Sequence, residues 1–154
     1  MYKRKNISGY IGCHLILYSR KLIIILLLLF TSGALFADTL YVVVSDNLRG
    51  MNFSATEIKH ILLGEVTRVK NSRVHLIYPS YSSSAIITLS KFVGKGGSAR
   101  NLKSYWSKMI FTGRGIPPDT ADNEAELRRL LEEDNSIGVS TQSAGMNVVF
   151  TISE

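Results

Sequence analysis

Four short apolar runs in the chain have the composition of buried β-strands. Residues 40–44 are continuously apolar and rich in β-branched side chains, which is typical of a strand covered on both faces. Residues 74–78 form a second such run, and Pro79 is predicted to end its pairing because proline cannot donate to a strand ladder. The last two predicted strands cover residues 137–140 and 147–152.

Apolar residues at helical spacing predict four helices between these strands. Ser54 and Glu57 form a capping box, and Gly64 is placed to end the same helix in a left-handed conformation. The most regular apolar stripe runs from Leu102 to Ile110. The predicted helices cover residues 55–63, 85–93, 99–111 and 124–134. Because strands and helices alternate, the fold class is predicted to be α/β, with a mainly parallel or mixed sheet flanked by helices.

The beginning of the chain has the pattern of a secretory signal. Two basic residues precede the apolar run 22–30, and small residues lead to Ala37. We therefore expect residues 1–37 to be a signal peptide and 38–154 to be one exported domain in the periplasm. A spanning helix needs about 20 apolar residues, more than this run offers. A second apolar stretch, 11–18, leaves an uncleaved inner-membrane anchor as the alternative.

The positive net charge is concentrated near the start of the chain. The formal net charge is +6, and five of the 18 Lys and Arg residues lie within the first 21 positions. All 12 acidic residues follow from Asp38 onward, so the expected mature domain is almost neutral. Such a domain has no basic stripe for nucleic acid. Cys13 is the only cysteine, so the expected domain can form no disulfide, thiolate metal site or cysteine nucleophile.

Catalytic and metal-binding patterns are missing from the sequence. His60 and His75 lack metal-ligand spacing and are expected at the surface or its boundary. No serine lies in a Gly-x-Ser-x-Gly motif, and Gly94-x-Gly96-Gly97 lacks the Lys-Ser/Thr of a phosphate loop. The sequence therefore predicts no enzymatic activity, no metal and no cofactor.

A hydroxyl-rich loop, residues 80–84, lies between a predicted strand and a predicted helix. Helix N-termini present free N–H groups and a partial positive charge to anions, and nearby hydroxyls add further donors. Ser82, Ser83 and Ser84 are therefore the predicted oxyanion-binding residues. The alternative is ordinary capping by one serine, with the others in a solvated loop.

Ser45 and Asp46 follow the first predicted strand directly. Ligands of open α/β sheets bind beyond the carboxyl ends of the strands. We therefore expect Ser45 and Asp46 to line the same crevice as the serine loop.

Three segments resemble, in the same order, short phosphate ABC transporter substrate-binding-like proteins of the type 2 periplasmic-binding superfamily. They are 58–65, with its helix and Gly-Glu ending, 105–118, with Tyr-Trp-Ser-Lys-Met-Ile-Phe-Thr-Gly-Arg-Gly and Pro-Pro, and 135–139, with Ile-Gly-Val. The resemblance covers residues 40–152. It implies one lobe of the periplasmic-binding fold that binds phosphate or a similar oxyanion in phosphate uptake or sensing. A membrane transporter or sensor would be its partner.

The sequence departs from that family at two places. The family tryptophan is either replaced by Val69 or absent, and residues 84–87 lack the arginine that short relatives carry there. About 117 residues suffice for roughly one lobe of a two-lobed clamp. These departures leave open a second hypothesis, a ligand-free interaction module of the same fold that forms a homodimer or binds a membrane protein.

Overall fold

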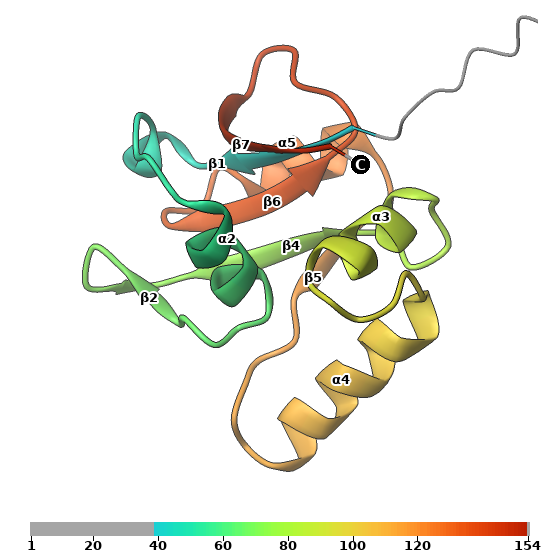
Figure 1. Cartoon of the computed structure of the whole chain (residues 1–154). Coiled ribbons are helices and arrows are strands. Elements are labelled where there is room, and N and C mark those ends of the chain that lie inside the picture. Colours follow the sequence, from blue (N-terminus) through green and yellow to red (C-terminus); the bar gives the residue numbers. More distant parts are fainter. Residues whose placement is uncertain (1–38, 154) are drawn as a thin grey trace, which may run out of the picture. The chain divides into compact units, whose positions relative to one another are not determined.

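A five-stranded sheet organises the computed structural model, which describes residues 39–153 (Figure 1). The predicted leader, residues 1–37, and the expected cut after Ala37 lie outside the described residues. The strand order is β5-β4-β6-β1-β7. The strands are β1 (Leu40–Val44), β4 (His75–Pro79), β5 (Asp119–Ala121), β6 (Ser136–Ser140) and β7 (Asn147–Ile152). A small separate hairpin consists of β2 (Arg68–Val69) and β3 (Ser72–Arg73).

Four α-helices and one 3-10 turn connect the strands within the described residues. They are η1 (Asp46–Leu48), α2 (Ala55–Leu62), α3 (Ala85–Phe92), α4 (Ala99–Phe111) and α5 (Glu124–Leu130). None of the helices within residues 39–153 has both the length and the apolar character needed to cross a bilayer.

The sheet is mixed, which confirms the predicted α/β class. Strand β4 runs parallel to both β5 and β6, whereas β1 runs antiparallel to β6 and β7. Consequently β1 points in the opposite direction to β4, and the carboxyl ends of these two strands lie at opposite edges of the sheet.

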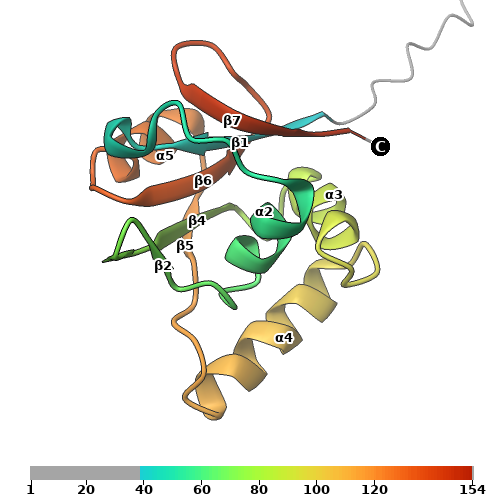
Figure 2. The same cartoon turned by 60° about the vertical axis from the view of Figure 1, so that its left-hand side comes forward.

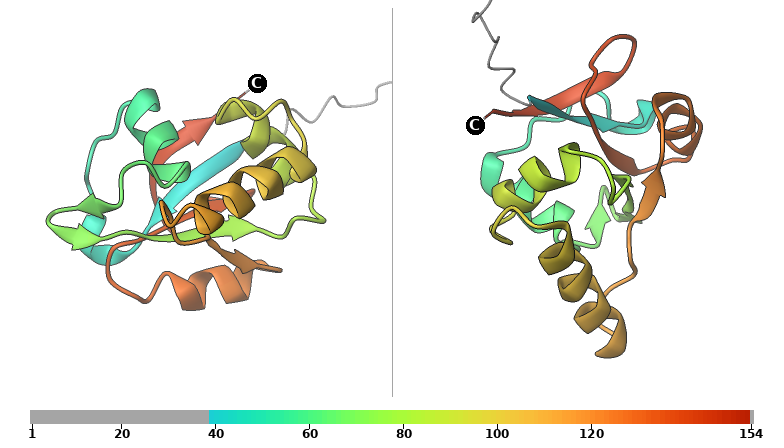
Figure 3. Two further views of the ribbon diagram at one scale, coloured as in Figure 1. Left: turned by 90° about the horizontal axis from the view of Figure 1, so that it is seen from below. Right: turned by 90° about the vertical axis from the view of Figure 1, so that its right-hand side faces the viewer.

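Alternating side chains divide the core between the two faces of the sheet. Val42 and Val44 belong to the larger cluster, which α2, α3 and α4 cover, whereas Val43 belongs to a smaller cluster beneath α5. Figure 2 and Figure 3 show α5 on one side of the sheet and the other helices on the opposite side. Helices on both faces explain why the first strand is apolar at consecutive positions.

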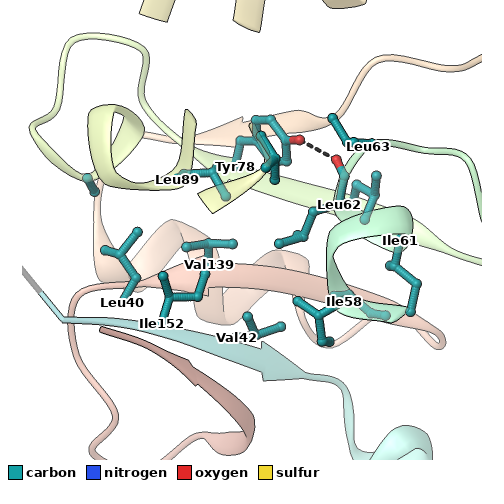
Figure 4. Packing of buried hydrophobic residues seen from close by; sticks show 14 of the residues in the cluster. Leu40, Val42, Ile58, Ile61, Leu62, Leu63, Tyr78, Leu89, Val139 and Ile152 are labelled. Atoms are coloured by element: carbon teal, nitrogen blue, oxygen red, sulfur yellow. Dashed lines mark hydrogen bonds between the residues drawn. The ribbon is translucent and has the colours of Figure 1, made fainter. Parts of the chain in front are cut away.

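Hydrogen bonds from two tyrosines fasten α2 to the rest of the large cluster. The buried Tyr78 hydroxyl donates to the Leu62 carbonyl (Figure 4), and the Tyr105 hydroxyl donates to the Leu63 carbonyl at 2.7 Å. Trp106 packs edge-on against Tyr78, with 6.1 Å between ring centroids. The C-terminal end of α2 is therefore joined to β4 and to α4 by hydrogen bonds as well as by apolar packing.

Several predicted boundaries are correct and others are not. The strands at 40–44 and 147–152 and the helix at 99–111 match the prediction. Strand β4 does not continue as a paired central strand past Pro79, as predicted: its pairing with β6 reaches only Ile77, and Pro79, its last residue, pairs only with Ala121 of β5. The hairpin and β5 were not predicted, since each is only two or three residues long.

Two helical predictions also need correction. Helix α5 ends at Leu130 instead of residue 134, and the chain then turns through Leu131. In α4, Leu102 and Trp106 are buried as expected, but Ile110 is 49% exposed. The stripe therefore faces the core only over its first part.

Candidate functional site

The serine loop opens into a cleft of about 290 Å³ at the carboxyl end of β4. The cleft lies where α3 and α5 both begin, beside the residues that follow β6. Its lining includes Ser80, Ser83, Ser84, Asp122, Glu124 and Thr141. Because β4, β5 and β6 are parallel, the residues after all three strands meet at this edge.

Ser83 carries the most distinctive donor of the cleft. Its Oγ is buried and has no hydrogen-bond partner among residues 39–153. Its backbone N–H donates to the Ser80 carbonyl at 2.9 Å, which fixes the turn that leads into α3. Leaving a buried hydroxyl without a hydrogen-bond partner costs about 1–3 kcal/mol. A ligand that accepted a hydrogen bond from Ser83 Oγ would remove this cost.

The N-terminus of α3 also has unused donor capacity. Ser84 is the N-cap residue, but its side chain makes no capping hydrogen bond. The corresponding residue of α2, Ser54, accepts from the Glu57 N–H as an ordinary cap does. Ser84 therefore does not cap α3 with its side chain, so no acceptor from the N-cap side chain competes with a ligand for the first N–H groups of α3.

Two carboxylates face these donors from the start of α5. Glu124 Oε2 accepts from the Ser140 hydroxyl at 2.9 Å, while Oε1 is buried without a hydrogen bond and lies 3.7 Å from Arg128 Nη2. The N-cap of α5 is Asn123, whose side chain accepts from the Glu126 N–H at 3.0 Å, so the Asp122 carboxylate is not needed for capping. No Lys or Arg is among the described residues that line the cleft.

The sequence did not identify Asp122, Glu124 or Thr141 as site residues. The available signal was their position after strands or at a helix start. That signal was hidden because β5 was not predicted, so the residues that follow it could not be assigned to the end of a strand.

Of the predicted serines, Ser83 and Ser84 line the cleft but Ser82 does not. Ser82 is exposed, and its hydroxyl lies 3.0 Å from that of Ser80. It supports the loop from outside and provides a matched control for its neighbours.

Ser45 and Asp46 do not reach this cleft, which contradicts the expectation of a shared crevice. The register places Val44 beside Ile137, and Ile137 beside Leu76, near the beginning of β4. The serine loop begins four residues further along, about 13 Å away at the rise of a strand. The prediction assumed that β1 is parallel to β4, whereas β1 is antiparallel to it.

Ser45 has a structural role at its own edge of the sheet. Its Oγ donates to Asn47 Oδ1 at 2.7 Å and accepts from the Ser136 N–H at 3.1 Å. Asp46 accepts from Asn147 Nδ2 at 2.7 Å and lines a separate hollow of about 210 Å³. Both groups are occupied by contacts within the chain.

His75 has partners that the sequence did not indicate. Its Nε2 lies 2.7 Å from Asp119 Oδ2, and its Nδ1 lies 3.4 Å from both Glu133 Oε2 and Ser136 Oγ. This arrangement resembles a nucleophile with its base, but Ser136 is 0% exposed and lies within β6. A substrate could not reach its hydroxyl, so the arrangement holds strand ends together.

His75 also lines a hollow of about 380 Å³, with Arg73, Arg114 and Glu133. This hollow lies at the amino end of β4, away from the serine loop. His60 is exposed and contacts Glu65 just after α2. Within residues 39–153, no three His, Cys, Asp or Glu side chains are grouped closely enough to hold a metal ion.

Comparison with known proteins gives one partial structural match. No family model matches the chain, and no curated protein matches it. The fold is similar to an ABC-type phosphate transport receptor from Vibrio cholerae, with a TM-score of 0.44 and 12% sequence identity. The match covers 73% of this chain and 45% of the receptor, so the chain spans less than half the receptor's length.

Proposed function

We propose that this chain is a periplasmic solute-binding-like protein that binds phosphate or a similar oxyanion at the serine-loop cleft. The observation that carries the proposal is the buried Ser83 hydroxyl, which lacks a partner within the described residues. It stands beside an α3 N-terminus whose cap side chain makes no hydrogen bond. Together they offer neutral donors to an anion, as helix N-termini do in many anion sites.

The carboxylates of the cleft favour an oxyanion that carries a proton. Glu124 Oε1 accepts no hydrogen bond within the described residues and has Arg128 Nη2 3.7 Å away, outside the residues that line the cleft, and Asp122 adds a second carboxylate to the lining. A fully ionised anion such as sulfate would meet like charge there, whereas a protonated oxyanion can donate to a carboxylate. Inorganic phosphate retains at least one proton at neutral pH, because its third ionisation lies far above pH 7, whereas sulfate retains none. We therefore expect the cleft to bind phosphate more tightly than sulfate.

Linkage to phosphate uptake or sensing, through a membrane transporter or sensor, is part of the same proposal and rests on the sequence resemblance. No enzymatic activity is proposed, because the one Ser–His pair that the described residues form contains a buried serine. The competing hypothesis of a ligand-free interaction module predicts no response to phosphate.

Calorimetric titration of wild type and two variants with phosphate tests the proposal. Wild type is expected to bind phosphate, and Ser83→Ala to bind at least tenfold more weakly because about 1.5–3 kcal/mol of charge-assisted hydrogen bonding is lost. Ser82→Ala is the control, since Ser82 is exposed and outside the cleft. Without phosphate, Ser83→Ala should be at least as stable as wild type, because it removes an unpartnered buried hydroxyl.

The variant Glu124→Gln tests the role of the Glu124 carboxylate as an acceptor, separately from the role of the Ser83 hydroxyl as a donor. This variant is expected to narrow the preference for phosphate over sulfate, because an amide can donate to a fully ionised oxygen. Equal phosphate binding by wild type and Ser83→Ala would contradict the proposed site. Absence of phosphate binding by wild type would favour the interaction module.

A further inference from the structure

Exposed apolar side chains are concentrated at the C-terminal end of α4. Six large hydrophobic residues among the described residues are exposed, and three of them are Ile110 (49%), Phe111 (92%) and Ile116 (61%). Phe111 is the last residue of α4, and Figure 3 shows this end of the helix directed away from the sheet. The apolar side chains therefore form a projecting tip and not part of the core.

The outer face of α4 is basic along its whole length. Residues 95–118 contain five Lys or Arg residues and no Asp or Glu. At 3.6 residues per turn, Arg100, Ser104, Ser107 and Phe111 share one face, and Lys103 and Lys108 flank it. All six of these residues are exposed.

Most of these cations are not used by the fold. Among residues 39–153, no ion pair or hydrogen bond is formed by the side chains of Arg100, Lys108 and Arg114. Lys103 lies over the Tyr81 ring, with its Nζ 4.9 Å from the centroid, and so remains at the surface. The positive charge of this face is therefore available to an external partner.

We propose that α4 and the turn after it dock on an anionic phospholipid surface, with Phe111, Ile110 and Ile116 entering the interface. Lys and Arg beside an apolar tip are the pattern of interfacial helices, in which long side chains reach phosphates while apolar groups enter the acyl boundary. The charge complements anionic lipid. Three exposed apolar side chains on a projecting tip fit a deformable lipid surface better than a rigid groove on a protein.

This surface is independent of the serine-loop cleft, which lies at the carboxyl end of β4 and contains no residue of 95–118. A failure of phosphate binding would therefore leave the docking proposal intact, and the reverse also holds.

Fluorescence of the full chain tests the proposal at the position concerned. Phe111→Trp places a reporter at the tip, and the native Trp106 is 2% exposed and provides a constant background. With vesicles of phosphatidylcholine and phosphatidylglycerol, its emission should shift to the blue and be quenched by brominated lipid. With phosphatidylcholine alone, or at high salt, both effects should be much weaker.

Two further variants make the outcome decisive. Val148→Trp is the matched control, because Val148 is 39% exposed on β7, outside α4. Brominated lipid should not quench the tryptophan introduced at position 148, even if another segment holds the chain on the vesicle. In the Phe111→Trp background, changing Arg100, Lys103 and Lys108 to Gln should lower vesicle partition about fivefold for each charge.

Three results would overturn the proposal: no quenching at position 111 with anionic vesicles, equal quenching at positions 111 and 148, or no effect of removing the three charges. An absence of any response to vesicles would direct attention to an acidic protein surface as the partner of α4.

Discussion

Gly64 is the position at which a single added methyl group should disturb the core most. It follows α2 with φ +68°, and its N–H donates to the Ile61 carbonyl at 2.8 Å. A Cβ at this position would lie 2.6 Å from Cη2 of Trp106, well inside van der Waals contact. Trp106 is itself buried against Tyr78, so its ring has little room to move.

Gly64→Ala should therefore lower the free energy of unfolding through two separate effects. The left-handed conformation costs an alanine about 1 kcal/mol. Overpacking against the indole adds about 1–3 kcal/mol. The sum is about 2–4 kcal/mol, and for a domain of this size each kcal/mol lowers the melting temperature by about 4 °C.

Gly113→Ala is the matched control for the conformational effect. Gly113 follows α4 as Gly64 follows α2, with φ +65° and with its N–H donating to the Ile110 carbonyl. A Cβ there would meet nothing within 4 Å. This variant should lose only about 1 kcal/mol. Urea denaturation measures both losses.

A second change tests the contact with Trp106 directly. In the Gly64→Ala background, Trp106→Phe should cost less than it does in wild type, because the smaller ring leaves room for the methyl group. Equal losses for Gly64→Ala and Gly113→Ala, or strictly additive losses in the double variant, would refute the reasoning.

Two other predictions concern hydrogen bonds at the two ends of α2. Burial raises the pKa of the Tyr78 hydroxyl, with the Trp106 indole N–H beside it acting in the opposite direction, so the group stays protonated at neutral pH. Tyr78→Phe leaves the Leu62 carbonyl without this donor and should lower the free energy of unfolding by about 1–3 kcal/mol in urea denaturation; a neutral change would contradict the role of this hydrogen bond. Hydrogen bonds from the backbone and then the side chain of Ser54 lower the pKa of Glu57 below 4.5. The carboxylate therefore contributes stability above pH 4.5 and loses it as the pH falls through the lower native pKa, so the advantage of wild type over Glu57→Gln should shrink in acid melts, and a constant difference would contradict this.

The features that the sequence predicts well depend on local chemistry. The capping box of Ser54 and Glu57 is present, and Gly64 adopts the left-handed conformation expected of it. The α4 boundaries are correct because Ser98 accepts from Asn101 at the start and Gly113 follows the end. Caps, glycines and apolar periodicity act over a few residues, so one sequence is sufficient to identify them.

The features that the sequence did not predict depend on long-range pairing. The direction of β1 relative to β4 is set by β6, which lies between them and comes about ninety residues after β1 along the chain. The local pattern of β1 is the same for either direction. For this reason the expectation that Ser45 and Asp46 share a crevice with the serine loop was wrong: they line a hollow at the other end of the strands, whereas Ser83 and Ser84 line the cleft at the carboxyl end of β4.

The exposure of Ile110 illustrates the same limit within one helix. The residue continues the apolar stripe of α4, but the helix runs beyond the sheet before its last turn (Figure 1). Periodicity identifies a face of a helix and does not say how far the core extends beneath it.

The most direct test of the account is the melting temperature of the chain with phosphate and with sulfate at matched ionic strength. A ligand at a hundred times its dissociation constant stabilises the native state by about 2.7 kcal/mol, which corresponds to several degrees. We predict that millimolar phosphate raises the melting temperature of wild type and of Ser82→Ala, that sulfate has a smaller effect, and that the phosphate response of Ser83→Ala is about half that of wild type or less. Equal melting temperatures with both anions and without either, or an undiminished phosphate response in Ser83→Ala, would contradict an oxyanion site at the serine loop.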